Sequence, residues 1–120
     1  MEIELGAVQE RFADLIWETE PIDSGELVKL CAERFGWKKS TTYTVLKKLC
    51  DKGLFRNEGG QVRACITRDT FYANRSKQIV TDSFRGSLPA FFAAFLSGRG
   101  LSDAEADEIR TMIDAYRKGE

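Results

Sequence analysis

Hydrophobic residues recur at helical spacing in the first third of the chain. One set shares a single helical face: Leu5, Val8, Phe12, Leu15 and Ile16. This pattern predicts a helix over about residues 5–18. Pro21 interrupts it, and Asp23 with Glu26 three residues later forms a capping box. A second helix is therefore expected from this box to about Phe35, ended by Gly36, with an apolar stripe made of Leu27, Leu30 and Cys31.

A third helix is expected between Ser40, a favourable N-cap, and Gly53, a favourable residue just past a helix end. Its apolar stripe consists of Val45, Leu46, Leu49 and Cys50, with Thr42 leaning the same way. At 100° per residue the opposite face carries Ser40, Thr44, Lys47, Lys48 and Asp51. This helix therefore combines one apolar face with one rich in hydroxyl and ammonium groups.

Two strand-like runs follow and are separated by Gly59 and Gly60, which suit a two-residue hairpin turn. After the turn, inward positions alternate with outward ones: Val62, Ala64 and Ile66 against Arg63, Cys65 and Thr67. The pattern predicts a β-hairpin with one face on the core and the other in solvent.

The rest of the chain has helical patterns over about residues 69–85, 88–97 and 103–117, the last opened by a Ser102–Glu105 capping box. Its large apolar side chains are Leu88, Phe91, Phe92, Phe95, Leu96, Ile109, Met112, Ile113 and Tyr116. About 50 residues have little core of their own, so these side chains are interpreted as a homodimer interface. The alternative is that they pack on the chain's own N-terminal part.

Three helices followed by a hairpin, with a basic third helix, is the plan of a winged helix-turn-helix. The predicted fold class is therefore mainly α with a small β-hairpin, followed by C-terminal helices. Residues 1–70 are expected to form a winged-helix DNA-binding domain, and residues 71–120 a helical dimerisation region.

Charge is unevenly distributed along the 120 residues, although the net charge is only −1. Nine acidic and two basic residues give residues 1–33 a net charge of −7, whereas nine basic and two acidic residues give 34–68 a net charge of +7. Residues 69–120, with seven basic and eight acidic residues, are close to neutral. Because nucleic-acid binding depends on where charge is placed, the middle third is the candidate DNA-binding segment.

Short hydroxyl side chains suit base edges, and cations suit phosphates. Thr41, Tyr43 and Thr44 are assigned to base edges, and Lys47, Lys48 and Lys52 to phosphates. The complete set of candidate DNA-binding residues is Lys39, Ser40, Thr41, Tyr43, Thr44, Lys47, Lys48, Lys52, Arg56 and Arg63, with Arg68 as a further candidate of the hairpin. The alternative is an ordinary solvated helix face whose Ser-Thr-Thr run is only an N-cap.

Other functional classes fit the composition less well. The chain has no histidine, which excludes Ser-His-Asp and Cys-His catalysis, so no enzyme activity, cofactor or metal site is expected. Three widely spaced cysteines argue against a disulfide framework. Cys31 and Cys50 are expected in the core, whereas Cys65 is a candidate redox-sensing thiol. An acidic N-terminus without an apolar run favours a cytoplasmic protein.

Three segments carry a resemblance to a known family. "LIWETEPIDSGELVKL", "WKKSTTYTVLKKLCDKGLFRNE" and "FRGSLPAFFAAFLSGRGLSDAEADEIRTMID" together span most of the chain. They resemble the penicillinase repressor (BlaI/MecI/CopY) family of transcriptional regulators. The resemblance implies a bacterial homodimeric repressor that binds a palindromic operator in double-stranded DNA.

The resemblance also implies a mode of regulation. In the β-lactam branch, a membrane sensor leads a protease to cut the repressor at an Asn-Phe bond in the C-terminal region. The nearest bond here is Ala94-Phe95, which keeps only the phenylalanine. The copper branch carries a Cys-x-Cys cluster near the C-terminus, and this chain has no cysteine after Cys65. A protein-interaction module and a ligand- or redox-sensing regulator are the alternative functions.

Overall fold

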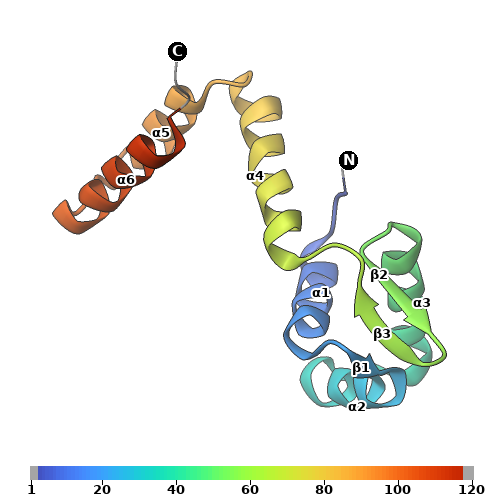
Figure 1. Ribbon diagram of the computed structural model, residues 1–120. Helices are drawn as coiled ribbons and strands as arrows, with labels where there is room; N and C mark the ends of the chain where they lie inside the picture. Colours follow the sequence, from blue (N-terminus) through green and yellow to red (C-terminus); the bar gives the residue numbers. More distant parts are fainter. Residues whose placement is uncertain (1–2, 118–120) are drawn as a thin grey trace. The chain divides into compact units, whose positions relative to one another are not determined.

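The computed structural model describes residues 3–117. The chain divides into two compact units, the first ending at Gln78 and the second beginning at Ile79 (Figure 1). The fold is mainly helical with one small antiparallel sheet, which confirms the predicted fold class. The assignment of residues 1–70 to DNA binding and of residues 71–120 to dimerisation stays a prediction.

The first unit contains the three predicted helices: α1 (Ala7–Thr19), α2 (Ser24–Phe35) and α3 (Lys39–Asp51). Asp23 caps α2 by accepting a hydrogen bond from the N–H of Gly25 at 3.1 Å. Gly36 ends α2 in the left-handed conformation at φ 67°, as predicted. The N-cap of α3 is Lys38, so α3 begins slightly earlier than the serine signal indicated.

The hairpin consists of β2 (Phe55–Glu58) and β3 (Gln61–Ala64), joined by Gly59 and Gly60 at φ 57° and 88°. Both positive φ values are easy for glycine and match the two-residue turn that was predicted. A third strand, β1 (Ile22–Asp23), pairs with β3 and gives the sheet order β1-β3-β2. We term β2, β3 and their turn the wing.

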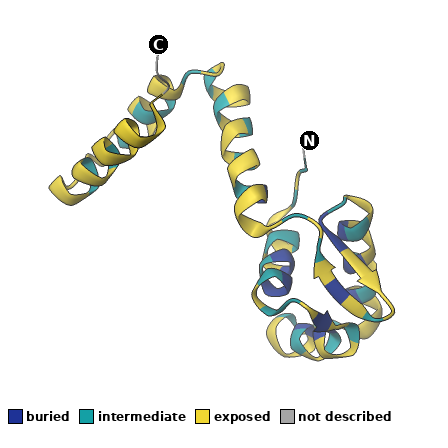
Figure 2. Ribbon diagram, viewed as in Figure 1, coloured by how far each residue is buried: buried dark blue, intermediate teal, exposed yellow. Residues whose placement is uncertain are grey.

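The hydrophobic core lies within the first unit, between the helices and the sheet (Figure 2). Its buried members are Phe12, Ala13, Leu15, Ile16, Ile22, Leu27, Cys31, Leu46, Leu49, Leu54, Phe55, Val62 and Phe71. Val8, assigned to the apolar stripe of α1, is instead 55% exposed. It lies in the first turn of α1, before the part of the helix that the core covers.

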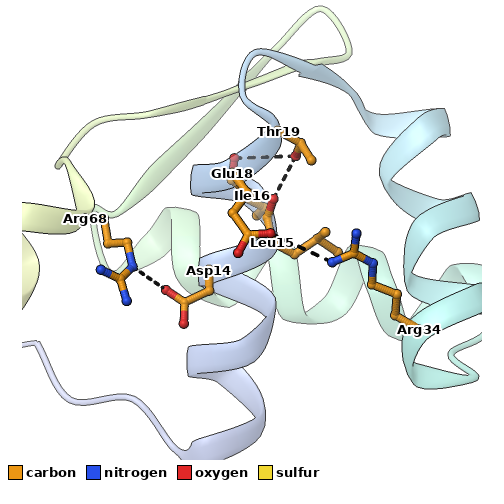
Figure 3. Close-up of polar contacts among 7 residues, drawn as sticks. All are labelled: Asp14, Leu15, Ile16, Glu18, Thr19, Arg34 and Arg68. Carbon is orange, nitrogen blue, oxygen red and sulfur yellow. Dashed lines mark hydrogen bonds and ion pairs between the residues drawn. The ribbon is translucent and has the colours of Figure 1, made fainter.

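The helix α4 (Arg68–Phe84) begins within the first unit. The indole N–H of Trp17 donates to the carbonyl of Ile66 at 2.9 Å, and its ring lies 5.5 Å from that of Phe71. Nε of Arg68 lies 3.0 Å from Oδ1 of Asp14, and Arg34 of α2 pairs with Glu18, one turn further along α1 (Figure 3). The start of α4 is thus held by aromatic packing and by charge.

The second unit contains α5 (Leu88–Leu96) and α6 (Asp103–Tyr116), and the chain reverses direction between them (Figure 1). The side chains of Ser102 and Glu105 form the predicted capping box at the start of α6. Neither helix contains a buried residue within its described range. The exposed fractions are 55% for Phe95 and 58% for Ile113, so the apolar stripes of this unit remain largely uncovered.

Candidate nucleic-acid interface

The orientation of α3 is set by its contacts with α2 and β2. Leu46 and Leu49 are buried on one face, together with Thr42, which is only 1% exposed. The hydroxyl of Thr42 donates to the carbonyl of Lys38 at 3.4 Å, and its side chain lowers the pKa of the Cys31 thiol on α2 against the larger, opposite effect of burial. Burial of this face against the core fixes how α3 is rotated.

That rotation places the opposite face of α3 in solvent (Figure 2). The exposed candidates on α3 are Lys39, Ser40, Thr41, Thr44, Lys47 and Lys48. The helix therefore brings these predicted residues together on one accessible surface. A helix of this kind has the width and chemistry that fit a DNA major groove.

The lysines differ in how free their ammonium groups are. Lys39 and Lys48 are exposed, and within residues 3–117 neither has an acidic partner. Lys47 lies 3.2 Å from Asp51, and both side chains are more than half exposed, so this pair is weak. Lys52 donates to the carbonyl of Glu4 at 2.8 Å, which holds it at the end of α3.

The hydroxyl groups are also not equivalent. Thr41 is exposed, whereas Thr44 donates its hydroxyl hydrogen to the carbonyl of Ser40 at 2.9 Å. Its oxygen keeps lone pairs that can accept a further hydrogen bond. Tyr43 is half-buried and donates to Oγ of Ser24, on α2, at 3.1 Å.

The wing presents two arginines on the same outer face. Arg56 on β2 lies directly opposite Arg63 on β3 in the strand register, and both are exposed. Arg56 also pairs with Glu58 at 2.6 Å, while Arg63 has no acidic partner among the described residues. Like charges directly opposite in an antiparallel pair destabilise a sheet. The pair is therefore unfavourable for folding, and it suits an anionic ligand.

The structure changes two details of the predicted site. Arg68 is the first residue of α4 and not part of the wing, and its guanidinium is engaged by Asp14 and stacked 4.7 Å from the ring centre of Tyr72. The hydrogen bond from Arg68 to Asp14 raises the pKa of the guanidinium. Lys38, exposed at the N-cap of α3, was not among the candidates. Its position beside Lys39 was the signal that could have identified it.

The cysteines differ in environment as expected. Burial raises the pKa of the Cys31 and Cys50 thiols, and the nearby Cys65 adds to the effect on Cys50. Cys31 is fully buried, Cys50 is half-buried and Cys65 is exposed, and all are free thiols. The two raised pKa values favour the neutral thiol, which is the unreactive form.

Comparison with known proteins adds one match. A family model described as penicillinase repressor matches residues 5–115, which is nearly the whole chain. No curated protein matches the sequence. In the part of the chain that the structure describes, no helix has the length and apolar character needed to cross a membrane.

Proposed function

The chain belongs to the penicillinase repressor family, and from this premise we propose that it represses transcription as a homodimer bound to a palindromic operator. Membership of this family indicates a DNA-binding transcriptional repressor, which is not a class of enzyme. The homodimer, the operator and the mode of release are the parts that we propose. A repressor of this kind acts in the bacterial cytoplasm, where its DNA is.

The observation that carries this proposal is the cationic surface of the wing and α3. Arg56 and Arg63 face each other across the wing without a carboxylate for each. Lys39 and Lys48 add uncompensated charge on the exposed face of α3. Opposed like charges destabilise a sheet, and the phosphates of duplex DNA carry the negative charge that neutralises them.

Within this surface we assign two kinds of contact. Lys39, Lys47, Lys48 and the wing arginines bind phosphates, which fixes orientation without reading sequence. Ser40, Thr41 and Thr44 face base edges, where the free lone pairs of Thr44 accept from the amino groups of adenine or cytosine. Tyr43 lies between these residues on α3, and Lys52, the C-cap of α3, is assigned to a phosphate.

The homodimer is assigned to the second unit. Its described residues include no buried apolar side chain, although Phe84, Phe91 and Phe95 form a series of ring contacts at 5.5 and 6.0 Å. Exposed apolar side chains of this unit include Leu88, Phe95, Leu101, Met112, Ile113 and Tyr116. Covering such a surface with its own copy gives a two-fold interface, and a two-fold protein matches a palindromic operator.

Release from DNA is assigned to cleavage in the second unit, away from the DNA-binding surface. Ala94 and Phe95 are exposed on α5, so a regulatory protease linked to a membrane sensor could reach this segment once the helix opens locally. Cutting there separates Phe95 and α6 from Phe84 and Phe91, without touching α3 or the wing. The regulated genes proposed are those of β-lactam resistance or a related stress response.

Selection from a random duplex library tests the proposed function. Full-length protein should enrich sequences with two inverted half-sites, whose centres lie about one helical turn or a multiple of it apart. The Arg56→Gln, Arg63→Gln double variant should enrich far less DNA under the same conditions. Recovery of a random population by the wild-type protein would contradict the proposal.

A further inference from the structure

Three elements of the first unit meet at Ser24, the first residue of α2. Its N–H donates to the carbonyl of Gly60 in the wing turn at 2.7 Å. Its Oγ accepts from the hydroxyl of Tyr43, on the first part of α3, at 3.1 Å. The preceding residue, Asp23, pairs with Gln61 in the sheet register. A continuous set of hydrogen bonds therefore runs from α3 through α2 to the wing.

We propose that the Tyr43–Ser24 hydrogen bond is a positioning device that holds α3 and the wing at the mutual orientation that a specific operator requires. We call Tyr43, Ser24 and Gly60 the junction. The inference rests on the proposed DNA-binding function and assigns a role to residues that need not touch DNA.

The junction is placed where orientation is otherwise weakly specified. The wing turn consists of Gly59 and Gly60, which have wide backbone freedom in the absence of tertiary contacts. The Ser24 N–H fixes one end of that turn through the Gly60 carbonyl. Tyr43 in turn fixes Ser24 relative to α3. Loss of the Tyr43 hydroxyl should thus loosen the wing without removing any charge from the DNA-binding surface.

The environment of Tyr43 favours this role over direct base reading. Its ring is half-buried against the core, in contrast to the exposed Thr41 and Thr44. A phenol has one hydrogen to donate, and in this structure Ser24 accepts it. Contact with a base through that hydrogen would require breaking the junction first.

Double-mutant analysis on the full-length protein tests the junction. Tyr43→Phe and Ser24→Ala should each weaken binding to the selected operator by about two- to tenfold, the effect of losing one hydrogen bond. The double variant should be no weaker than the weaker single variant, because both changes remove the same bond. Affinity for a random duplex should change by less than about twofold, since the phosphate contacts remain. Ser76→Ala, at an exposed serine on the part of α4 that belongs to the first unit, should change neither affinity.

Amide hydrogen exchange gives a readout that does not depend on DNA. The Ser24 amide should exchange about two- to tenfold faster in Tyr43→Phe than in the wild type, since its bond to Gly60 loses support. Unchanged exchange would overturn the junction. Two results together would instead make Tyr43 a base-reading residue. The first is a loss of affinity in the double variant equal to the product of the two single losses. The second is an altered preference at one base pair in Tyr43→Phe but not in Ser24→Ala. A wild-type protein that binds no duplex would overturn the proposed function, and the exchange rates would still decide whether the junction exists.

Discussion

At the scale of single residues, α3 carries side chains with different chemical tasks on one exposed face. The exposed positions follow from the 3.6-residue period and were predictable from the sequence. The polar partners were not, because they depend on other elements: Tyr43 donates to Ser24, and Lys52 donates to Glu4, at sequence separations of 19 and 48 residues. Periodicity identifies a face, whereas the engagement of each polar group requires the tertiary fold.

Substitution of Thr44 and of Lys48 should separate base reading from phosphate binding. Thr44→Ala removes an acceptor, so it should relax preference at particular base pairs, each by about 1–3 kcal/mol. Lys48→Ala removes a charge, so it should weaken binding to all sequences alike. Competition with single-base variants of the operator measures both effects. A uniform loss of affinity in Thr44→Ala would show that this division of tasks is wrong.

Alkylation should follow the order of cysteine exposure. Cys65 is exposed, whereas burial raises the pKa of both Cys50 and Cys31, and Cys31 is fully buried. Iodoacetamide at pH 8 should therefore modify Cys65 first and Cys31 only after unfolding. Peptide mapping over time measures the order. Modification of Cys31 as fast as Cys65 in the native protein would contradict the packing between α2 and α3.

At the scale of elements, the helices and the hairpin were predictable because each has a local signal. These signals lie in or next to the element that they predict. They are the apolar period of the helices, Gly36 after α2, the Gly59–Gly60 turn of the hairpin and the capping serine of α6. The strand β1 has no such signal: it contains two residues, and its partner β3 begins at Gln61. Its pairing depends on the wing being in place, so no local pattern could have indicated it.

The opposed arginines of the wing should make folding and binding respond in opposite directions. Arg63→Gln removes repulsion with Arg56, so the free energy of unfolding should rise by about 0.2–1 kcal/mol. The same change should weaken duplex binding, because a phosphate contact is lost. Urea denaturation and fluorescence anisotropy measure the two quantities. A lower unfolding midpoint in Arg63→Gln would show that Arg63 stabilises the wing itself.

At the scale of the whole molecule, the core and the exposed apolar surface belong to different units. All buried hydrophobic residues of the described chain precede Gln78, whereas α5 and α6 leave Phe95, Met112 and Ile113 more than half exposed. The sequence indicated this difference through the density of large apolar side chains after residue 87. The partner that covers these side chains is a second molecule, so the sequence of one chain does not predict how the two surfaces fit together.

Truncation should separate folding from dimerisation. A chain ending at Arg85 retains the core and the whole of α4, so it should stay folded but become monomeric. Affinity for the two-half-site operator should fall steeply as avidity is lost, while binding to a single half-site should persist. Sedimentation and anisotropy measure these outcomes.

In the full-length chain, Phe92→Asp should likewise produce monomers, because an unpaired charge is costly in an apolar interface. A stable dimer in both cases would place the interface elsewhere.

The salt dependence of operator binding tests the central claim, that α3 and the wing form a phosphate-binding surface, most directly. Four to six phosphate contacts per protomer should give log K against log salt concentration a slope of about −4 to −5 per protomer. Lys48→Ala and Arg63→Gln should each reduce the magnitude of that slope by about 0.9 per protomer, whereas Lys77→Gln on α4 should leave it unchanged. An affinity that stays constant from low to moderate salt, or a slope that these two variants do not alter, would contradict the account.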